Sequence, residues 1–158
     1  MNKKIKYLTK ASAIGALYVV LTLISAIFGL SGSVVQVRFS EALTILPYFF
    51  PEAVLGLTVG CVIANLLTGC ALWDIAFGSV ATFIGAYFTS KIKNRWLLPV
   101  PPILSNAIIV PFVLMYVYGA KESFLFIMFT VALGEIISCG LLGQMLYTVV
   151  NKNEIFKR

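Results

Sequence analysis

Long apolar runs separated by short polar interruptions make up most of the chain. Several of them approach or exceed the roughly 20 helical residues that cross a ~30 Å hydrocarbon layer. The clearest runs are Tyr7 to Leu30, Leu72 to Ser90, Pro102 to Tyr118 and Ser123 to Val150. This pattern predicts an all-α, polytopic membrane protein, with residues 1–158 in a single transmembrane domain and no second, soluble domain.

The stretch from Ser40 to Leu67 has two interpretations. It is either one kinked helix or two spans broken at Phe50-Pro51-Glu52. Proline disfavours helix in the residue before it and suits the first turn of a new helix, so the sequence itself allows the break. The second interpretation gives a bundle of six helices, with a short second helix from Ser40 to Phe50 and a third from Glu52 to Leu67.

The positive charges favour two spans. Ten of the twelve basic residues would then lie on one side of the membrane: Lys3, Lys4, Lys6, Lys10, Lys91, Lys93, Arg95, Lys152, Lys157 and Arg158. One kinked helix would instead put Lys91 on the opposite side. Because basic residues concentrate in cytoplasmic segments, we expect a cell-membrane protein with both termini cytoplasmic, and Arg38 and Lys121 outside.

The predicted second helix is too short to cross the membrane by itself. Eleven residues at ~1.5 Å per residue extend about 16 Å, half of a bilayer core. The preceding segment, Val34 to Phe39, largely alternates apolar and polar residues, which is typical of extended backbone. Since irregular backbone at membrane depth needs protein or a wet cavity around it, we expect this segment to line a cavity open to the outside.

Composition agrees with a lipid-embedded chain. Sixty per cent of the residues are hydrophobic and 11% are charged, and the mean hydropathy is +0.99. The net charge of +6 lies at the chain ends and in one short loop rather than along a face, so it does not indicate nucleic-acid binding. Cys61, Cys70 and Cys139 lack a Cys-x-x-Cys spacing and are expected to be free thiols.

Acidic residues inside apolar segments are the strongest candidates for function. A charge at the centre of a membrane helix costs about 2.5–3.5 kcal/mol, so it marks a site by default. Glu135 lies near the middle of the last helix and is either a ligand or proton site or a structural carboxyl. Glu41 and Asp74 begin the second and fourth helices at the outer level, where each either binds a ligand or complements a helix dipole.

Amide, aromatic and loop residues complete the candidate site. Asn65 belongs to the same outer layer and is equally explained by a hydrogen bond between helices. Asn106 lies lower, beside Ser105, where a hydrogen bond between helices is the favoured interpretation. Trp73 is either an interfacial anchor or a stacking wall for a flat ligand. Gln36 and Arg38 are either rim residues or solvated loop. The candidate set contains three acids, Glu41, Asp74 and Glu135, and one arginine, Arg38, so it is net negative. Together with the amide donors and the indole, it suits a small cationic ligand that also forms hydrogen bonds.

Several activities lack the residues that they require. The chain has no histidine, no metal-ligand spacing and no nucleophile beside a base, so we expect neither an enzyme nor a metal or other cofactor. It also has no Gly-x-x-x-x-Gly-Lys loop, so ATP coupling would need partner chains. Small residues four apart on the first helix, Ala11 with Gly15 and Ser12 with Ala16, form either a docking face or internal packing.

Five motifs occur along the chain in this order: Gln36-Val37-Arg38-Phe39-Ser40-Glu41-Ala42-Leu43, Pro51-Glu52-Ala53, Trp73-Asp74, Leu104-Ser105-Asn106-Ala107 and Gly134-Glu135. On these motifs the chain resembles the QueT family over nearly its whole length. Members of this family are the substrate-binding S-components of energy-coupling factor transporters. The resemblance implies capture of a queuosine precursor, 7-aminomethyl-7-deazaguanine being the expected one. It also implies delivery by a membrane coupling protein, the T-component, with two ATPase subunits.

Similar S-components present an Ala-x-x-x-Ala face to the coupling protein. In this chain the nearest matches to that pattern are Ala11 with Gly15 and Ser12 with Ala16. The sequence therefore does not decide which pair would form the docking face. Independently of the resemblance, a small proton-coupled transporter or exporter of cations, acting as an oligomer with a titrating Glu135, is the alternative. The sequence does not decide which acid would contact which ligand group.

Overall fold

The structure is a computed structural model that describes residues 2–30 and 35–152. Within these ranges it contains helices and no strand. The elements, in chain order, are α1 (Lys3–Ile27), η2 (Phe39–Tyr48), α2 (Glu52–Leu67), α3 (Leu72–Thr89), η3 (Arg95–Leu97), α4 (Val100–Tyr116), α5 (Phe124–Glu135), η4 (Ile136–Leu142) and α6 (Gly143–Lys152). The last three form one continuous rod, so the predicted six-helix bundle with a short second helix is confirmed.

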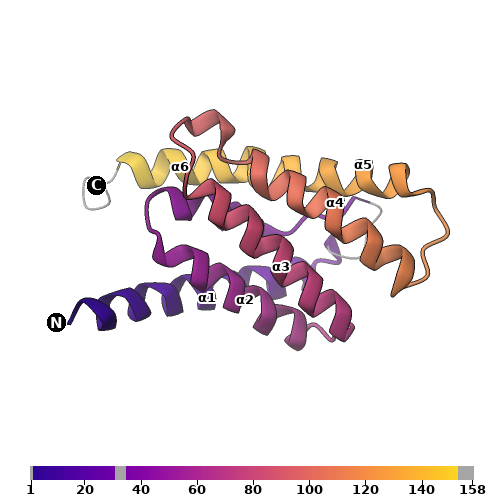
Figure 1. Cartoon of the computed structure of the whole chain (residues 1–158), viewed down its shortest axis with the longest axis horizontal. Helices are drawn as coiled ribbons and strands as arrows, with labels where there is room; N and C mark the ends of the chain where they lie inside the picture. The colour runs from indigo at the N-terminus through magenta and orange to yellow at the C-terminus, as the bar shows by residue number, and fades with distance from the viewer. Residues whose placement is uncertain (1, 31–34, 153–158) are drawn as a thin grey trace.

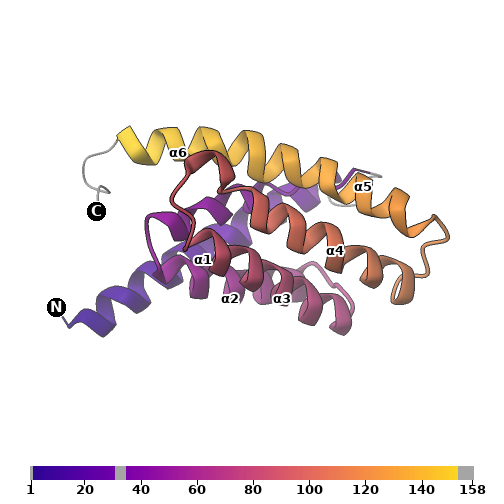
Figure 2. The ribbon, with the colours of Figure 1, turned by 45° about the horizontal axis from the view of Figure 1, so that its top comes forward.

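The helices run alternately up and down along one long axis (Figures 1 and 2). The start of α1 and the end of α6 lie at the same end of the bundle, which we call the terminal end. The turns at residues 68–71 and 117–123 lie at the opposite end, which we call the loop end. An even number of passes therefore separates the amino terminus from the loop that carries Lys91, as the charge pattern predicted.

The outer surface of the bundle is apolar and its polar residues lie inside. Four described helical stretches are long and apolar enough to cross a membrane: Lys3–Ile27, Leu72–Thr89, Arg95–Tyr116 and Phe124–Lys152. Large side chains such as Leu104, Phe129 and Leu141 are exposed, whereas Glu41, Asn65 and Asn106 are buried. This inverts the arrangement of a water-soluble protein and fits a multi-pass membrane protein.

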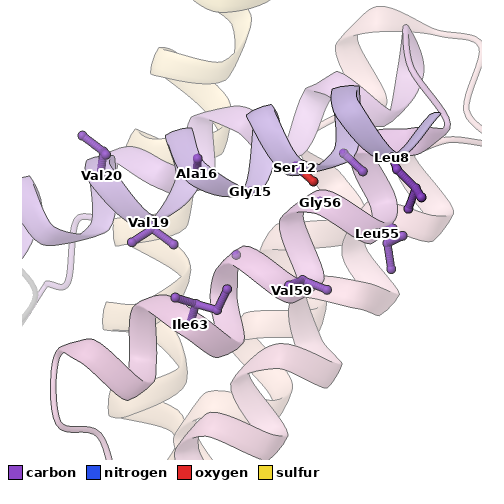
Figure 3. Close-up of a pocket in the computed structure, with 12 residues that line it drawn as sticks. Leu8, Ser12, Gly15, Ala16, Val19, Val20, Leu55, Gly56, Val59 and Ile63 are labelled. Carbon is purple, nitrogen blue, oxygen red and sulfur yellow. The ribbon is translucent and has the colours of Figure 1, made fainter. Parts of the chain in front are cut away.

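Glycines bring α1 and α2 into backbone contact. A Cβ atom on Gly15 would lie 2.9 Å from the Gly56 carbonyl oxygen, and one on Gly60 would lie 2.8 Å from the Gly15 carbonyl oxygen. Close approach of this kind increases van der Waals contact between membrane helices. Outside the contact, the two helices form an apolar groove of about 600 Å³ (Figure 3).

The second helix differs from the expected α-helix because η2 is a 3₁₀-helix. Its residues from Ser40 to Pro47 are all buried, so neighbouring helices surround it. Pro47 lacks an N–H group and cannot donate an α-helical hydrogen bond to Leu43. At ~2.0 Å per residue, ten 3₁₀ residues extend about 20 Å, further than the same number of α-helical residues.

The predicted last helix, Ser123 to Val150, is interrupted by a π-helical segment, η4, which the sequence did not indicate. This segment packs against η2. The Thr44 hydroxyl lies 3.4 Å from the Cys139 sulfur, and the Arg38 backbone N–H donates to the Ser138 hydroxyl at 3.1 Å. Turns of π-helix are frequent at functional sites.

Candidate substrate-binding site

A polar cavity of about 430 Å³ lies at the loop end, between the helices. It takes its walls from α1, α2, α3 and α4 and from the extended segment before η2. The lining residues are Thr22, Ala26, Gly29, Gln36, Arg38, Asn65, Thr68, Cys70, Asp74, Leu114 and Tyr118. Gln36 and Arg38 thus line a cavity as the alternating pattern predicted, while Val34 lies outside the described residues.

Asp74 is the acidic residue in this lining. It lies in the first turn of α3, where the helix dipole favours a negative charge. The Tyr118 hydroxyl donates a hydrogen bond to Asp74 Oδ2 at 2.8 Å and accepts one from the Ala71 N–H at 3.1 Å. Partial burial, followed by this bond and the negative charge of Asp74, raises the pKa of Tyr118 to about 12. The hydroxyl therefore remains a donor at neutral pH.

Asn65 faces Asp74 across a glycine. A Cβ atom on Gly78 would lie 3.3 Å from Asn65 Nδ2 and 3.6 Å from Asp74 Oδ1, so the missing side chain leaves room for both polar groups. The Asn65 amide is within hydrogen-bonding distance of the Cys61 sulfur, at 3.6 Å. The cavity wall therefore presents a carboxylate and an amide close together.

The extended segment is held against η4 and the end of α5. A Cβ atom on Gly134 would collide with the carbonyl oxygen of Gln36, so the backbones touch there. The Arg38 guanidinium lies within electrostatic range of Asp74, Glu41 and Glu135. Among the described residues it forms no ion pair within 4.0 Å, since the salt bridge found there joins Lys10 to Glu52.

A second polar group lies deeper in the bundle, and we call it the inner cluster: Glu41, Glu135 and Cys139. Ligating atoms of these three side chains lie within 4.8 Å of one another. Glu135 Oε1 accepts a hydrogen bond from the Asn106 amide at 3.0 Å, and Oε2 accepts one from the Cys139 thiol at 3.0 Å. Glu41 Oε1 accepts a hydrogen bond from the Tyr18 hydroxyl.

The predicted site residues thus separate into two groups. Asp74, Asn65, Gln36 and Arg38 line the cavity. The other predicted acids, Glu41 and Glu135, meet in the inner cluster, and Asn106 of α4 forms an interhelical hydrogen bond to Glu135 of this cluster. Thr22 links the groups, because it lines the cavity and its hydroxyl lies 2.8 Å from the Ser40 hydroxyl, next to Glu41.

Trp73 lies apart from both groups. Its side chain is 64% exposed and stacks on Phe77, on the outer face of the bundle. Trp73 therefore does not line the cavity.

Sequence reasoning missed four polar residues of the site: Tyr18, Thr22, Tyr118 and Cys139. A signal existed for the first two, because a hydroxyl-bearing pair at positions i and i+4 in an apolar helix lies on one face. No comparable signal marks Tyr118, which follows α4 in a turn.

The two small-residue pairs of α1 have different surroundings. Ala11 and Gly15 are buried, and a Cβ on Gly56 would collide with the Ala11 carbonyl oxygen. Ser12 and Ala16 are exposed and line the groove between α1 and α2 (Figure 3). Ala11 and Gly15 therefore pack within the bundle, and Ser12 and Ala16 remain accessible.

Comparison with known proteins supports this description. A relative named "Queuosine precursor transporter QueT", from Lactococcus lactis subsp. cremoris (strain MG1363), is 32% identical over 72 residues. This alignment covers 45% of the present chain and 41% of the relative, so the match spans less than half of either protein. No solved structure matches. A model of the family described as QueT transporter matches residues 8–152, a range that includes every residue that lines the cavity. The chain therefore belongs to the QueT transporter family.

Proposed function

We propose that this chain is the membrane-embedded substrate-binding subunit for uptake of a queuosine precursor, 7-aminomethyl-7-deazaguanine. The observation that carries the proposal is the polar cavity at the loop end, inside a bundle with an apolar exterior. Polar groups in such surroundings are costly unless they serve a ligand or a partner side chain. The name of the Lactococcus relative supports a queuosine precursor as the ligand class.

The cavity fits the chemistry of a deazaguanine. Its volume of about 430 Å³ lies within the range of small-molecule sites. A guanine-like edge presents N–H donors and a carbonyl acceptor, which match a carboxylate such as Asp74 and donors such as Asn65 and Arg38. In this proposal Asp74 and Asn65 read the base edge, and Gln36 and Arg38 close the cavity from the extended segment.

Transport by this chain requires other proteins in our proposal. The sequence has no phosphate-binding loop, so we assign energy coupling to a T-component and two ATPase subunits of an energy-coupling factor complex. The exposed Ser12 and Ala16 allow another helix to approach α1 closely, so we place the coupling protein in the groove of Figure 3. The loop end then faces outward in the cell membrane, with both termini in the cytoplasm.

Calorimetry with the purified chain tests the binding proposal. The chain alone should bind 7-aminomethyl-7-deazaguanine at one site. Asp74→Asn should weaken binding about 10- to 100-fold, the loss of one charge-assisted hydrogen bond. Trp73→Phe is the matched control and should bind normally, because Trp73 lies outside the cavity. Absence of binding by the unmodified chain would rule the proposal out.

The purified chain, reconstituted in liposomes with the T-component and the two ATPase subunits, tests whether ATP hydrolysis drives uptake. Ser12→Leu should retain ligand binding and lose ATP-dependent uptake, because a bulky side chain fills the groove. Uptake driven by a pH gradient without ATP would instead favour the proton-coupled transporter.

A further inference from the structure

The inner cluster contains two buried carboxyl groups without an adjacent cation. Glu41 is 2% exposed and Glu135 is 8% exposed. Within the described ranges, no lysine or arginine nitrogen lies within 4.0 Å of either group, because the salt bridge found there joins Lys10 to Glu52. Arg38 lies within electrostatic range of both carboxyls and of Asp74. Burying a carboxylate without a paired cation is costly.

One carboxyl oxygen of this pair accepts no hydrogen bond among the described residues. Glu41 Oε2 is buried and has no hydrogen-bond partner among the described residues. A buried acceptor without a partner destabilises the fold, so it points to an occupant that donates to it. A carboxylate oxygen of Glu135 lies within 4.8 Å of one of Glu41, a separation that a single donor atom can bridge.

The surrounding groups hold the carboxyls in place. Tyr18 donates to Glu41 Oε1 and Asn106 donates to Glu135 Oε1, and both donors are neutral. These bonds fix the orientation of both side chains, so a donor that binds between them meets preorganised acceptors.

Hydrogen bonds connect the cavity wall to the backbone that carries the inner cluster. Thr22 and Arg38 line the cavity, and each reaches the cluster: the Thr22 hydroxyl contacts Ser40, next to Glu41, and the Arg38 backbone bonds to Ser138, next to Cys139. Residues that line the cavity thus contact the sequence neighbours of Glu41 and Cys139.

We propose that Glu41 and Glu135 form an ammonium subsite beneath the cavity, which selects ligands that carry a primary amine. This inference rests on the proposed function, since it places the deazaguanine ring in the cavity and its aminomethyl group between the two acids. The ammonium donates to Glu41 Oε2 and to Glu135, and it supplies the positive charge that Arg38 provides at a distance. Asp74 then hydrogen-bonds to the ring, and the two acids of the inner cluster bind the charged amine.

Two ligands that differ in this one group provide the test. The unmodified chain and its variants are titrated by calorimetry with 7-aminomethyl-7-deazaguanine and with the neutral 7-cyano-7-deazaguanine. Glu41→Gln and Glu135→Gln should weaken binding of the amine about 10- to 100-fold and binding of the nitrile less than about threefold. Asp74→Asn should weaken binding of both ligands alike.

Two controls separate charge recognition from other roles of the cluster. Cys139→Ser keeps both carboxyls and should retain the preference for the amine, as should the unmodified chain treated with a metal chelator. Glu135→Asp keeps the carboxyl group and should also retain the preference for the amine. If Glu135→Gln binds neither ligand because it does not fold, Glu135→Asp is used in its place.

The outcomes distinguish the two proposals. Equal losses for both ligands in the folded glutamine variants, or no preference for the amine in the unmodified chain, would overturn the ammonium subsite and leave the proposed function intact. Loss of the preference in Cys139→Ser or after chelation would overturn it in favour of a metal. Binding of neither ligand by the unmodified chain would remove the proposed function itself.

Discussion

Asp74 and Tyr118 show how single residues determine the chemistry of the cavity. The carboxylate lies in a helical first turn, which favours its charge, and the phenol that bonds to it stays neutral because its pKa is raised to about 12. The Tyr118 hydroxyl also accepts the Ala71 N–H, so one side chain ties the turn after α4 to the start of α3. The bond thus joins two sides of the cavity at the loop end.

The raised pKa of Tyr118 predicts an alkaline loss of stability. A folded-state pKa above the ordinary value of 10.0 means that the contribution is complete below pH 10.0 and disappears as the pH rises through about 12. The stability difference between the unmodified chain and Tyr118→Phe should therefore be constant below pH 10.0 and shrink above it. Thermal unfolding in detergent at several pH values measures this difference.

Tyr116→Phe is the matched control for this experiment, because Tyr116 is 83% exposed on the same helix end. It should show no such pH-dependent difference. Parallel curves for Tyr118→Phe and the unmodified chain at all pH values would contradict the assigned role of the hydrogen bond.

At the scale of elements, two irregular segments build the site. The 3₁₀-helix η2 carries Glu41, and the π-helix η4 carries Cys139 and follows Glu135 directly. The extended segment before η2 touches the chain at Gly134, one residue before Glu135. Two segments about 100 residues apart in sequence therefore position both the cavity wall and the inner cluster.

The contact at Gly134 predicts a strong effect of a single methyl group. Gly134→Ala would drive a Cβ into the Gln36 carbonyl oxygen, and the neighbouring atom is backbone that cannot rotate away. We expect a loss of stability of about 1–3 kcal/mol, as for overpacked cores, together with weaker ligand binding. Thermal unfolding and calorimetry measure the two effects.

Gly140→Ala provides the comparison within the same rod. Its added Cβ would meet Ile136 Cγ2 at 3.7 Å, an ordinary van der Waals distance. This variant should be neutral or slightly more stable, since alanine favours helix by up to about 1 kcal/mol. Equal behaviour of the two variants would show that the extended segment does not depend on its contact with α5.

At the scale of the whole molecule, charge and topology agree. The described basic residues of α1, of the loop after α3 and of the end of α6 share the terminal end, and Lys121 lies at the loop end. The cavity opens near the same loop end. In our proposal the positive-inside tendency places this end, and the cavity with it, on the outside of the cell.

Thiol labelling of intact cells tests this orientation. In a Cys70→Ser background, Lys121→Cys should react with a membrane-impermeant maleimide, and Lys93→Cys should react only after the membrane is permeabilised. Both positions are exposed, and Cys61 and Cys139 are buried. The reverse pattern of labelling would invert the proposed orientation.

The sequence by itself determined that lipid surrounds the protein, that the fold is all-α, and how many times the chain passes along the bundle. Lipid requires long apolar helices, and the basic residues distinguish one side of the membrane from the other, so hydropathy and charge predict six helices and a short second one. The same reasoning identified Glu41, Asp74 and Glu135, because a charge within an apolar run is visible without knowing its neighbours. The resemblance to the QueT family likewise depended on motifs along the chain.

The tertiary structure alone decided which of these residues meet. Whether Glu41 faces Asp74 or Glu135 depends on the rotation and relative height of helices that are far apart in sequence, and local periodicity carries no information on either. The Asn106 to Glu135 bond, the link through Thr22 and the outward position of Trp73 all follow from that packing. The 3₁₀ and π segments arise for the same reason, since surrounding helices, rather than intrinsic propensity, compensate for their poorer backbone geometry.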